Sequence, residues 1–132
     1  MQSRIEPGKD IDDVASGVIS AAIEVHKHLG PGYLESVYEE ALGIELGLRG
    51  ITCRRQHPVP VRYKGMMIGE GRADMFVADK LIVELKAVET LLPIHKAQLI
   101  SYLRGMELSL GLLINFNVRM LRDGIQRVVY SF

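Results

Sequence analysis

The 132-residue sequence has a single cysteine, no long apolar run and no excess of charge of either sign. Cys53 alone cannot form an internal disulfide, which favours an intracellular protein. The longest unbroken apolar runs, such as 112–114, are far too short to cross a bilayer. The polar residues that follow Met1 do not form the apolar core of a signal peptide. We therefore expect a cytoplasmic protein that does not enter a membrane.

The absence of net charge also limits the kinds of partner. Lysine and arginine together number 16, as do aspartate and glutamate. This balance excludes a strongly basic coat for nucleic acid, although a neutral total can hide a divided surface. Hydrophobic residues make up 48% of the chain, which is enough to bury a core. We expect a loose N-terminal end over 1–9 and a single domain over 10–132.

The spacing of apolar residues changes from helical to alternating along the chain. Helices are predicted over 11–29, 34–49 and 94–104. Asp10 would cap the first of them. Pro93 suits the first turn of the third, which would continue until Gly105. Strands are predicted over 59–63, 67–77, 81–87, 110–116 and 125–130. The three consecutive strands predict an antiparallel meander, and the helix after them leads to a parallel neighbour. The fold class is therefore α/β, with a mixed sheet and helices packed on it.

Two neighbouring strands of this prediction bring charged residues together. Glu84 and Lys86 are two positions apart, so they share one face of their strand. A three-residue loop over 78–80 pairs position 74 with 84 and puts Asp74 beside Glu84. A two-residue loop without a bulge would send the two carboxylates to opposite faces. The hypothesis of a metal site therefore depends on the register.

Adjacent carboxylates repel each other unless a positive charge lies between them. Mg²⁺ or Mn²⁺ supplies that charge and takes oxygen ligands. Such an ion polarises a phosphoryl oxygen and lowers the pKa of a bound water. Lys86 can orient that water, help to deprotonate it, or stabilise negative charge on the phosphodiester. Together Asp74, Glu84 and Lys86 supply what metal-assisted phosphodiester hydrolysis requires.

The spacing of an acid and a lysine is weak evidence by itself. Sixteen acidic residues and six lysines in a chain of this length predict about 0.7 chance occurrences. A charged pair on the solvated face of a half-buried strand is the open alternative for Glu84 and Lys86. Glu39 and Glu40 are likewise expected to be solvated, and Tyr38 is expected in the core.

A polar stripe follows on the predicted helix, where His95, Gln98 and Tyr102 are three and four positions apart. Gln and Tyr beside a catalytic strand could bind a scissile phosphate or a base, although a stripe exposed to solvent is the simpler explanation. The same Gln-x-x-x-Tyr spacing recurs at Gln126 and Tyr130 in a predicted strand, where we treat it as accidental.

Several segments together resemble a known family. They are 25–32, Gly32-Tyr33-Leu34-Glu35-Ser36-Val37-Tyr38, 73–74, 82–87, 97–103, 111–116 and 123–127. The sequence is similar over about 11–130 to the GxxExxY protein family of bacteria and archaea. That family is grouped with the PD-(D/E)XK nuclease superfamily, whose restriction-endonuclease-like core has the order αβββαβ. The predicted order of elements agrees with that core.

The resemblance implies a role for each matched residue. Asp74 and Glu84 correspond to the metal-binding acids and Lys86 to the catalytic lysine. Glu35 corresponds to a helical acid that often completes the metal site. The sequence departs from the superfamily pattern at Ala73, which replaces a proline that carries no ligand.

The resemblance also extends to the predicted helix after the strands. Gln98 and Tyr102 look like the Gln-x-x-x-Tyr feature of the RecB-type exonuclease branch. In that role they would hold the substrate backbone or a water molecule of the metal.

Three functions follow as hypotheses. The first is a Mg²⁺-dependent nuclease that acts on DNA, with a homodimer as a source of further contacts. The second is a non-catalytic nucleic-acid-binding or protein-interaction module on the same fold, and the third is a hydrolase of nucleotides or other phosphoesters. Phosphate affinity comes mostly from lysine and arginine, so clustering of basic residues around Glu84 would separate the first two. The candidate cations are Arg54, Arg55, Arg62, Lys64, Arg72 and Lys96.

Overall fold

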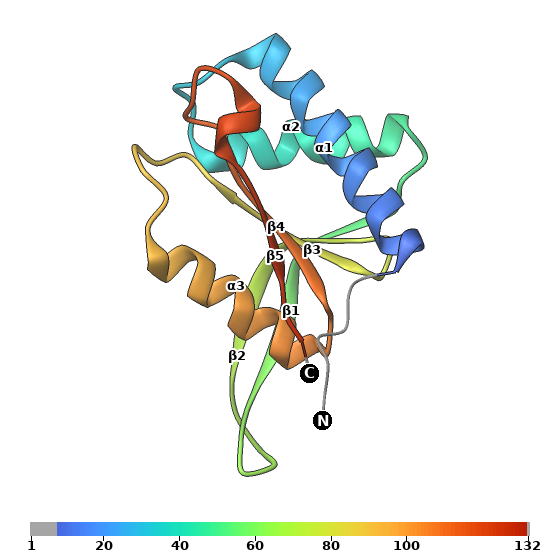
Figure 1. Cartoon of the computed structure of the whole chain (residues 1–132), viewed down its shortest axis with the longest axis vertical. Helices are drawn as coiled ribbons and strands as arrows, with labels where there is room; N and C mark the ends of the chain where they lie inside the picture. The colour runs from blue at the N-terminus through green and yellow to red at the C-terminus, as the bar shows by residue number, and fades with distance from the viewer. Residues whose placement is uncertain (1–7, 132) are drawn as a thin grey trace.

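The computed structural model describes residues 8–131 of the chain (Figure 1). Its helices are α1 (Lys9–Leu29), α2 (Glu35–Leu48), α3 (Pro93–Met106) and the short 3₁₀ helix η1 (Leu121–Gly124). Its strands are β1 (Cys53–Tyr63), β2 (Met66–Val77), β3 (Leu81–Lys86), β4 (Leu110–Asn115) and β5 (Ile125–Val129). None of the helices within this range is both long and apolar enough to cross a membrane.

The strands form one sheet in the order β1-β2-β3-β4-β5. Strands β1 to β3 are an antiparallel meander, and α3 crosses over to place β4 parallel to β3. Strand β5 is antiparallel to β4. These pairings confirm the predicted mixed sheet.

Both faces of the sheet are covered, α1 and α2 lying on one face and α3 on the other (Figure 1). In β3, Leu81, Val83 and Leu85 pack with α1 and α2. The intervening Ile82 packs with Leu99 and other residues under α3. Alternation along β3 therefore divides two apolar layers, rather than an apolar layer from solvent.

The helix boundaries differ from prediction at two ends. Helix α1 begins at Lys9, so Asp10 lies in its first turn and Gly8 is the cap. Residue 9 of the loose end expected over 1–9 is therefore helical, and residues 1–7 lie outside the described part. Helix α3 continues past Gly105 to Met106, and the capping residue Glu107 that follows has a left-handed backbone. A Cβ at Gly105 would lie 2.8 Å from the Pro60 carbonyl oxygen, so this glycine permits close packing on β1 and does not end the helix.

Strand β1 begins six residues earlier than the predicted start at 59. Its first half is rich in polar residues, and Gln56 has a positive φ of 51° that interrupts the alternation. The hairpin of β1 and β2 then extends beyond α3 as a projecting arm (Figure 1). The predicted turn at 123–124 is the end of η1.

Candidate active site

Strands β2 and β3 separate at the predicted acid pair. Backbone pairing joins Val77 to Leu81, Phe76 to Ile82 and Met75 to Val83, which confirms the register predicted from a three-residue loop. At the next pair of positions, Asp74 and Glu84, hydrogen bonds to side chains replace the backbone hydrogen bonds between the strands. The Asp74 N–H donates to Glu84 Oε2 at 2.7 Å, and the Leu85 N–H donates to Asp74 Oδ2 at 2.8 Å. The two carboxylates therefore lie side by side in the opening between the strands.

Burial and mutual repulsion act on this pair. Glu84 is only 3% exposed, so the alternative of a solvated face is wrong for this residue. Burial, together with the nearby charge of Asp74, raises the pKa of Glu84 to about 8, against the lowering effect of the Asp74 N–H and of Lys86. Burial also raises the pKa of Asp74, although its hydrogen bond from Leu85 opposes the shift.

Glu35 lies at the carboxyl end of β3, where α2 begins. Burial is the main cause that raises the pKa of Glu35; the charge of Lys86 and a hydrogen bond from the Ala87 N–H lower it, and the charge of Asp74 raises it. The predicted helical acid therefore lies within electrostatic range of the lysine and of the acid pair. Glu35 also acts electrostatically on Glu84.

Tyr38 fixes the start of α2, one turn after Glu35. It is fully buried and stacks on Phe116, with ring centroids 4.4 Å apart. Its hydroxyl donates to the Gly30 carbonyl oxygen at 2.6 Å and accepts from the Tyr33 N–H at 3.2 Å. The prediction that Tyr38 is a core residue is confirmed, and this core residue holds the turn that presents Glu35.

The three residues of the polar stripe predicted on α3, His95, Gln98 and Tyr102, have different surroundings. A Cβ at Gly71 would lie 2.7 Å from Tyr102 Cε1, so Tyr102 packs directly on β2 because residue 71 is glycine. Burial raises the pKa of Tyr102, and so do the charges of Glu84 and Asp74, which places this side chain near the acid pair. Gln98 is exposed. His95 Nδ1 accepts the Leu92 N–H at 3.0 Å, which closes the first turn of α3.

Glu39 and Gln56 adjoin the site, and sequence reasoning missed both. Glu39 is 9% exposed, so its predicted solvation is wrong, whereas Glu40 is exposed. Gln56 Nε2 donates to Glu39 Oε1 at 2.8 Å and reaches Asp74 Oδ1 at 3.4 Å. Arg55 Nε donates to Glu39 Oε2 at 3.0 Å. The available signal was the four-residue spacing from Glu35, which puts both acids on one helix face.

The donors of the acid pair suit a hard divalent cation. Asp74 and Glu84 offer carboxylate oxygens, the ligands that Mg²⁺ prefers, and water usually completes its coordination. Glu84 Oε1 accepts no hydrogen bond from residues 8–131, and Asp74 Oδ1 has only the long contact from Gln56. In that same range no three His, Cys, Asp or Glu side chains converge closely enough to hold a metal. Glu35 therefore stands apart from the pair in this conformation.

The candidate basic residues do not all gather around Glu84. Arg54 pairs with Asp79 at 3.2 Å, in the turn between β2 and β3. Arg55 is paired with Glu39 and Glu40. Arg72 Nη1 donates to the Gln56 carbonyl oxygen at 3.0 Å, next to the site. Carboxylates therefore neutralise Arg54 and Arg55, two of the cations that were candidates for binding nucleic acid.

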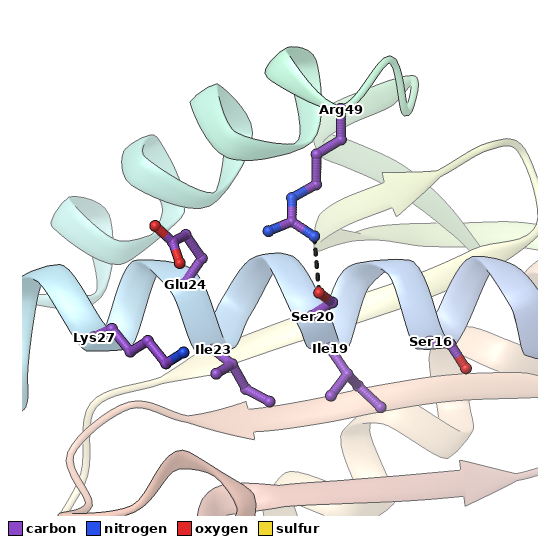
Figure 2. Close-up of a pocket in the computed structure, with 7 residues that line it drawn as sticks. All are labelled: Ser16, Ile19, Ser20, Ile23, Glu24, Lys27 and Arg49. Atoms are coloured by element: carbon purple, nitrogen blue, oxygen red, sulfur yellow. Dashed lines mark hydrogen bonds between the residues drawn. The ribbon is translucent and has the colours of Figure 1, made fainter.

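A groove along α1 is separate from these residues. Figure 2 shows its lining, in which Arg49 Nη1 donates to Ser20 Oγ at 2.8 Å. None of the predicted site residues lines this groove. The site is therefore the opening between β2 and β3, together with the helix starts that border it.

A family model described as the PD-(D/E)XK nuclease superfamily matches residues 12–128. The chain belongs to this superfamily, and its mixed sheet with packed helices is the restriction-endonuclease-like fold. A solved structure described as "Crystal structure of SSO0001" is 20% identical, with a TM-score of 0.49 over 73% of this chain. The chain spans about half of that one, 48% of its length. No curated protein matches the sequence.

Proposed function

We propose that this protein is a nuclease that uses Mg²⁺ or Mn²⁺ to hydrolyse phosphodiester bonds in DNA. The observation that carries the proposal is the pair formed by Asp74 and Glu84 in the opening between β2 and β3. Membership of a nuclease superfamily supports the reaction class. We also assign the chain to the GxxExxY family and to the RecB-type branch, on the motifs around Glu35 and Gln98.

Each residue has a distinct role in this proposal. Asp74 and Glu84 would hold the ion, and Glu35 would complete the site by a movement of its exposed side chain. The bound ion would polarise the phosphate and lower the pKa of a water molecule. Lys86, which carries positive charge toward both Glu84 and Glu35, would orient that water and stabilise negative charge on the phosphate.

Gln98 and Tyr102 would bind the substrate backbone or a water of the metal. The packing of Tyr102 on Gly71 supports this role, because it holds the ring near the acids with little freedom. Gln98 lies one turn earlier on α3 and is exposed, so its amide is accessible to a strand that enters the site.

An interaction module is the second candidate, and one observation favours it. The arm formed by β1 and β2 exposes large apolar side chains: Val61, Tyr63, Met66, Met67 and Ile68. Apolar groups gathered in this way mark a surface that binds a partner. A second copy of the chain in a homodimer would cover this arm and could also supply contacts to DNA.

The decisive experiment measures cleavage of linear, circular and single-stranded DNA with Mg²⁺ or Mn²⁺. We expect Glu84→Ala and Lys86→Ala each to lower the rate by at least about 100-fold, because each removes a group that acts on the reacting phosphate. Lys80→Ala is the matched control, since Lys80 precedes β3 at the end away from the site. Its rate should stay within about twofold of wild type.

Two results would contradict the nuclease function. One is cleavage that persists unchanged in Glu84→Ala and Lys86→Ala, which would indicate a contaminant. The other is an inert wild type in which calorimetry detects no binding of Mg²⁺ or Mn²⁺. The interaction module would then be the better description.

A further inference from the structure

A second site candidate lies where the end of α1 meets η1. A cavity of about 460 Å³ is lined there by three cations, Lys27, Arg119 and Arg122. Its remaining wall includes Ile23, Pro31 and Met120. This cavity contains none of the residues proposed for catalysis.

The cations of this cavity keep their charge uncompensated. None of the three forms an ion pair with any residue from 8 to 131, and no aspartate or glutamate lines the cavity. By contrast, Arg49 and Arg127 are paired with carboxylates at 2.8 Å. Three like charges around one concavity produce a local positive potential that attracts an anion.

Apolar side chains line the cavity together with the three cations. Met120 is 51% exposed, and Pro31, which lines the same cavity, is also exposed. Figure 2 shows Ile23 leaving α1 with the Lys27 ammonium beside it, while Glu24 points towards α2. The volume lies in the range of small-molecule sites, and the mixture of charge and apolar surface suits a phosphate joined to a sugar and a base.

A buried histidine holds the two walls of the cavity together. His26 on α1 is 9% exposed and donates from Nε2 to the Val118 carbonyl oxygen at 2.8 Å. This bond ties the segment that carries Arg119 to the helix that carries Lys27. The arrangement therefore does not depend on the loop alone.

The cavity lies at the same edge of the sheet as the acid site. The Phe116 N–H donates to the Lys86 carbonyl oxygen at 2.9 Å, so the segment leading to Arg119 begins beside the proposed catalytic lysine. Three residues of chain span at most about 11 Å, and the four from Pro31 to Glu35 at most about 14 Å. Figure 1 shows η1 beside the turn from α1 to α2, which leads into Glu35.

We propose that this cavity binds one unpaired nucleotide of the DNA strand, next to the bond that is cut. Its phosphate would contact Lys27, Arg119 and Arg122, and its sugar and base would lie against Met120 and Pro31. The inference rests on the proposed nuclease function, since it places the cavity on the path of the substrate strand. It also adds three positive charges to those of Lys86 and Arg72 near the site.

The test measures binding of a fluorescent single-stranded oligonucleotide and of a blunt duplex as salt is varied. Binding of both DNAs is measured with the Lys86→Ala variant, which should not cleave them. Adding Arg119→Ala with Arg122→Ala should weaken single-strand binding about tenfold, and the slope of log affinity against log salt should fall by about 0.7 for each lost phosphate contact. Duplex binding should change less than about twofold. Arg49→Ala with Arg127→Ala is the control with the same change in charge, and it should have no effect.

A second variant separates charge from apolar contact. Met120→Ser should weaken single-strand binding about threefold and leave the salt slope unchanged, because it removes apolar surface and no charge. A reduced slope in Met120→Ser would indicate a rearranged loop and would overturn the assignment of the apolar wall.

The outcomes separate this inference from the nuclease function. Cleavage by wild type with an unchanged salt slope in the arginine variant would overturn the nucleotide site alone. Equal losses on single strand and duplex would overturn its preference for an unpaired nucleotide. Arginine-dependent binding by an inert wild type would reject the nuclease and retain the nucleotide site. A wild type that binds neither DNA would reject both.

Discussion

Two buried glutamates lie in neighbouring regions of the molecule, and their negative charges are compensated to different degrees. On α2, Glu39 accepts from Gln56 at 2.8 Å and from Arg55 at 3.0 Å. Between β2 and β3, Glu84 accepts one backbone N–H and lies beside a second carboxylate, Asp74. The carboxylate of Glu39 thus has hydrogen-bond donors and a cationic partner, whereas the carboxylate of Glu84 is repelled by the neighbouring Asp74.

The difference separates a carboxylate that the protein compensates from one that we propose to be functional. A buried carboxylate is stable when hydrogen bonds and a positive partner replace the water that it loses. Glu39 has both, and it supports the amide that reaches Asp74. Glu84 lacks a direct cationic contact, and a strongly raised pKa of this kind is typical of functional groups. We therefore expect the two residues to respond in opposite directions to the same substitution.

The largest effect should appear when each glutamate becomes glutamine in metal-free protein at pH 9. Glu39→Gln should lower the free energy of unfolding by about 2 kcal/mol, because it weakens hydrogen bonds from Gln56 and Arg55. Glu84→Gln should raise it by about 2 kcal/mol, because it removes a repelled charge and keeps an acceptor for the Asp74 N–H. Urea unfolding in EDTA measures both. Equal losses would show that Glu84 is as well compensated as Glu39.

A smaller effect is expected in the pH dependence of stability and of its response to Mg²⁺. The pKa of Glu84 is about 8 in the folded chain and near 4.5 as a free side chain. Between these values the folded chain holds a proton that the unfolded chain has released, so stability falls as pH rises through this window. If Mg²⁺ binds Glu84 as we propose, it must displace the same proton. The rise in melting temperature on adding Mg²⁺ should therefore be several degrees larger at pH 8.5 than at pH 6.5.

Differential scanning fluorimetry of wild type and Glu84→Gln checks this dependence. The variant should show little response to Mg²⁺ at either pH, because one of its two carboxylates is gone. A wild-type response that is the same at both pH values would contradict the raised pKa.

The smallest effect tests how Tyr102 is held near Glu84. Gly71→Ala should lower DNA cleavage about tenfold, because its Cβ would displace the Tyr102 ring. Gly69→Ala is the control on the same strand, since a Cβ there meets no atom within 4 Å. Cleavage assays and thermal unfolding should show two variants of similar stability and different activity. Equal activity would indicate that the position of Tyr102 does not matter for catalysis.

Local patterns predicted the element order and the key register with good accuracy. The length of the loop between β2 and β3 decides which residues face each other, and the pairing of Met75 with Val83 is the register expected for a three-residue loop. Apolar spacing likewise predicted α2 to within one residue at each end. Patterns failed at the start of β1, where an edge strand needs little apolar surface and Gln56 breaks the alternation.

The candidate site was predicted in part. The motifs supplied Glu35, Asp74, Glu84 and Lys86, and the structure brings them to one edge of the sheet. Glu39 was misjudged because its burial depends on Arg55 and Gln56, which lie 16 and 17 positions away in the chain. No local pattern signals such a contact.

By itself the sequence determined the order of the main elements and limited the register of β2 and β3 to two alternatives, because these depend on side-chain period and loop length. Only the tertiary structure decided which charges are buried and what surrounds them. The packing of α3 on the sheet turned the face of Glu84 from solvent to interior, and the separation of β2 from β3 left its carboxylate beside Asp74. Burial and electrostatic energy depend on all neighbours within several ångströms, and those neighbours come from distant parts of the chain.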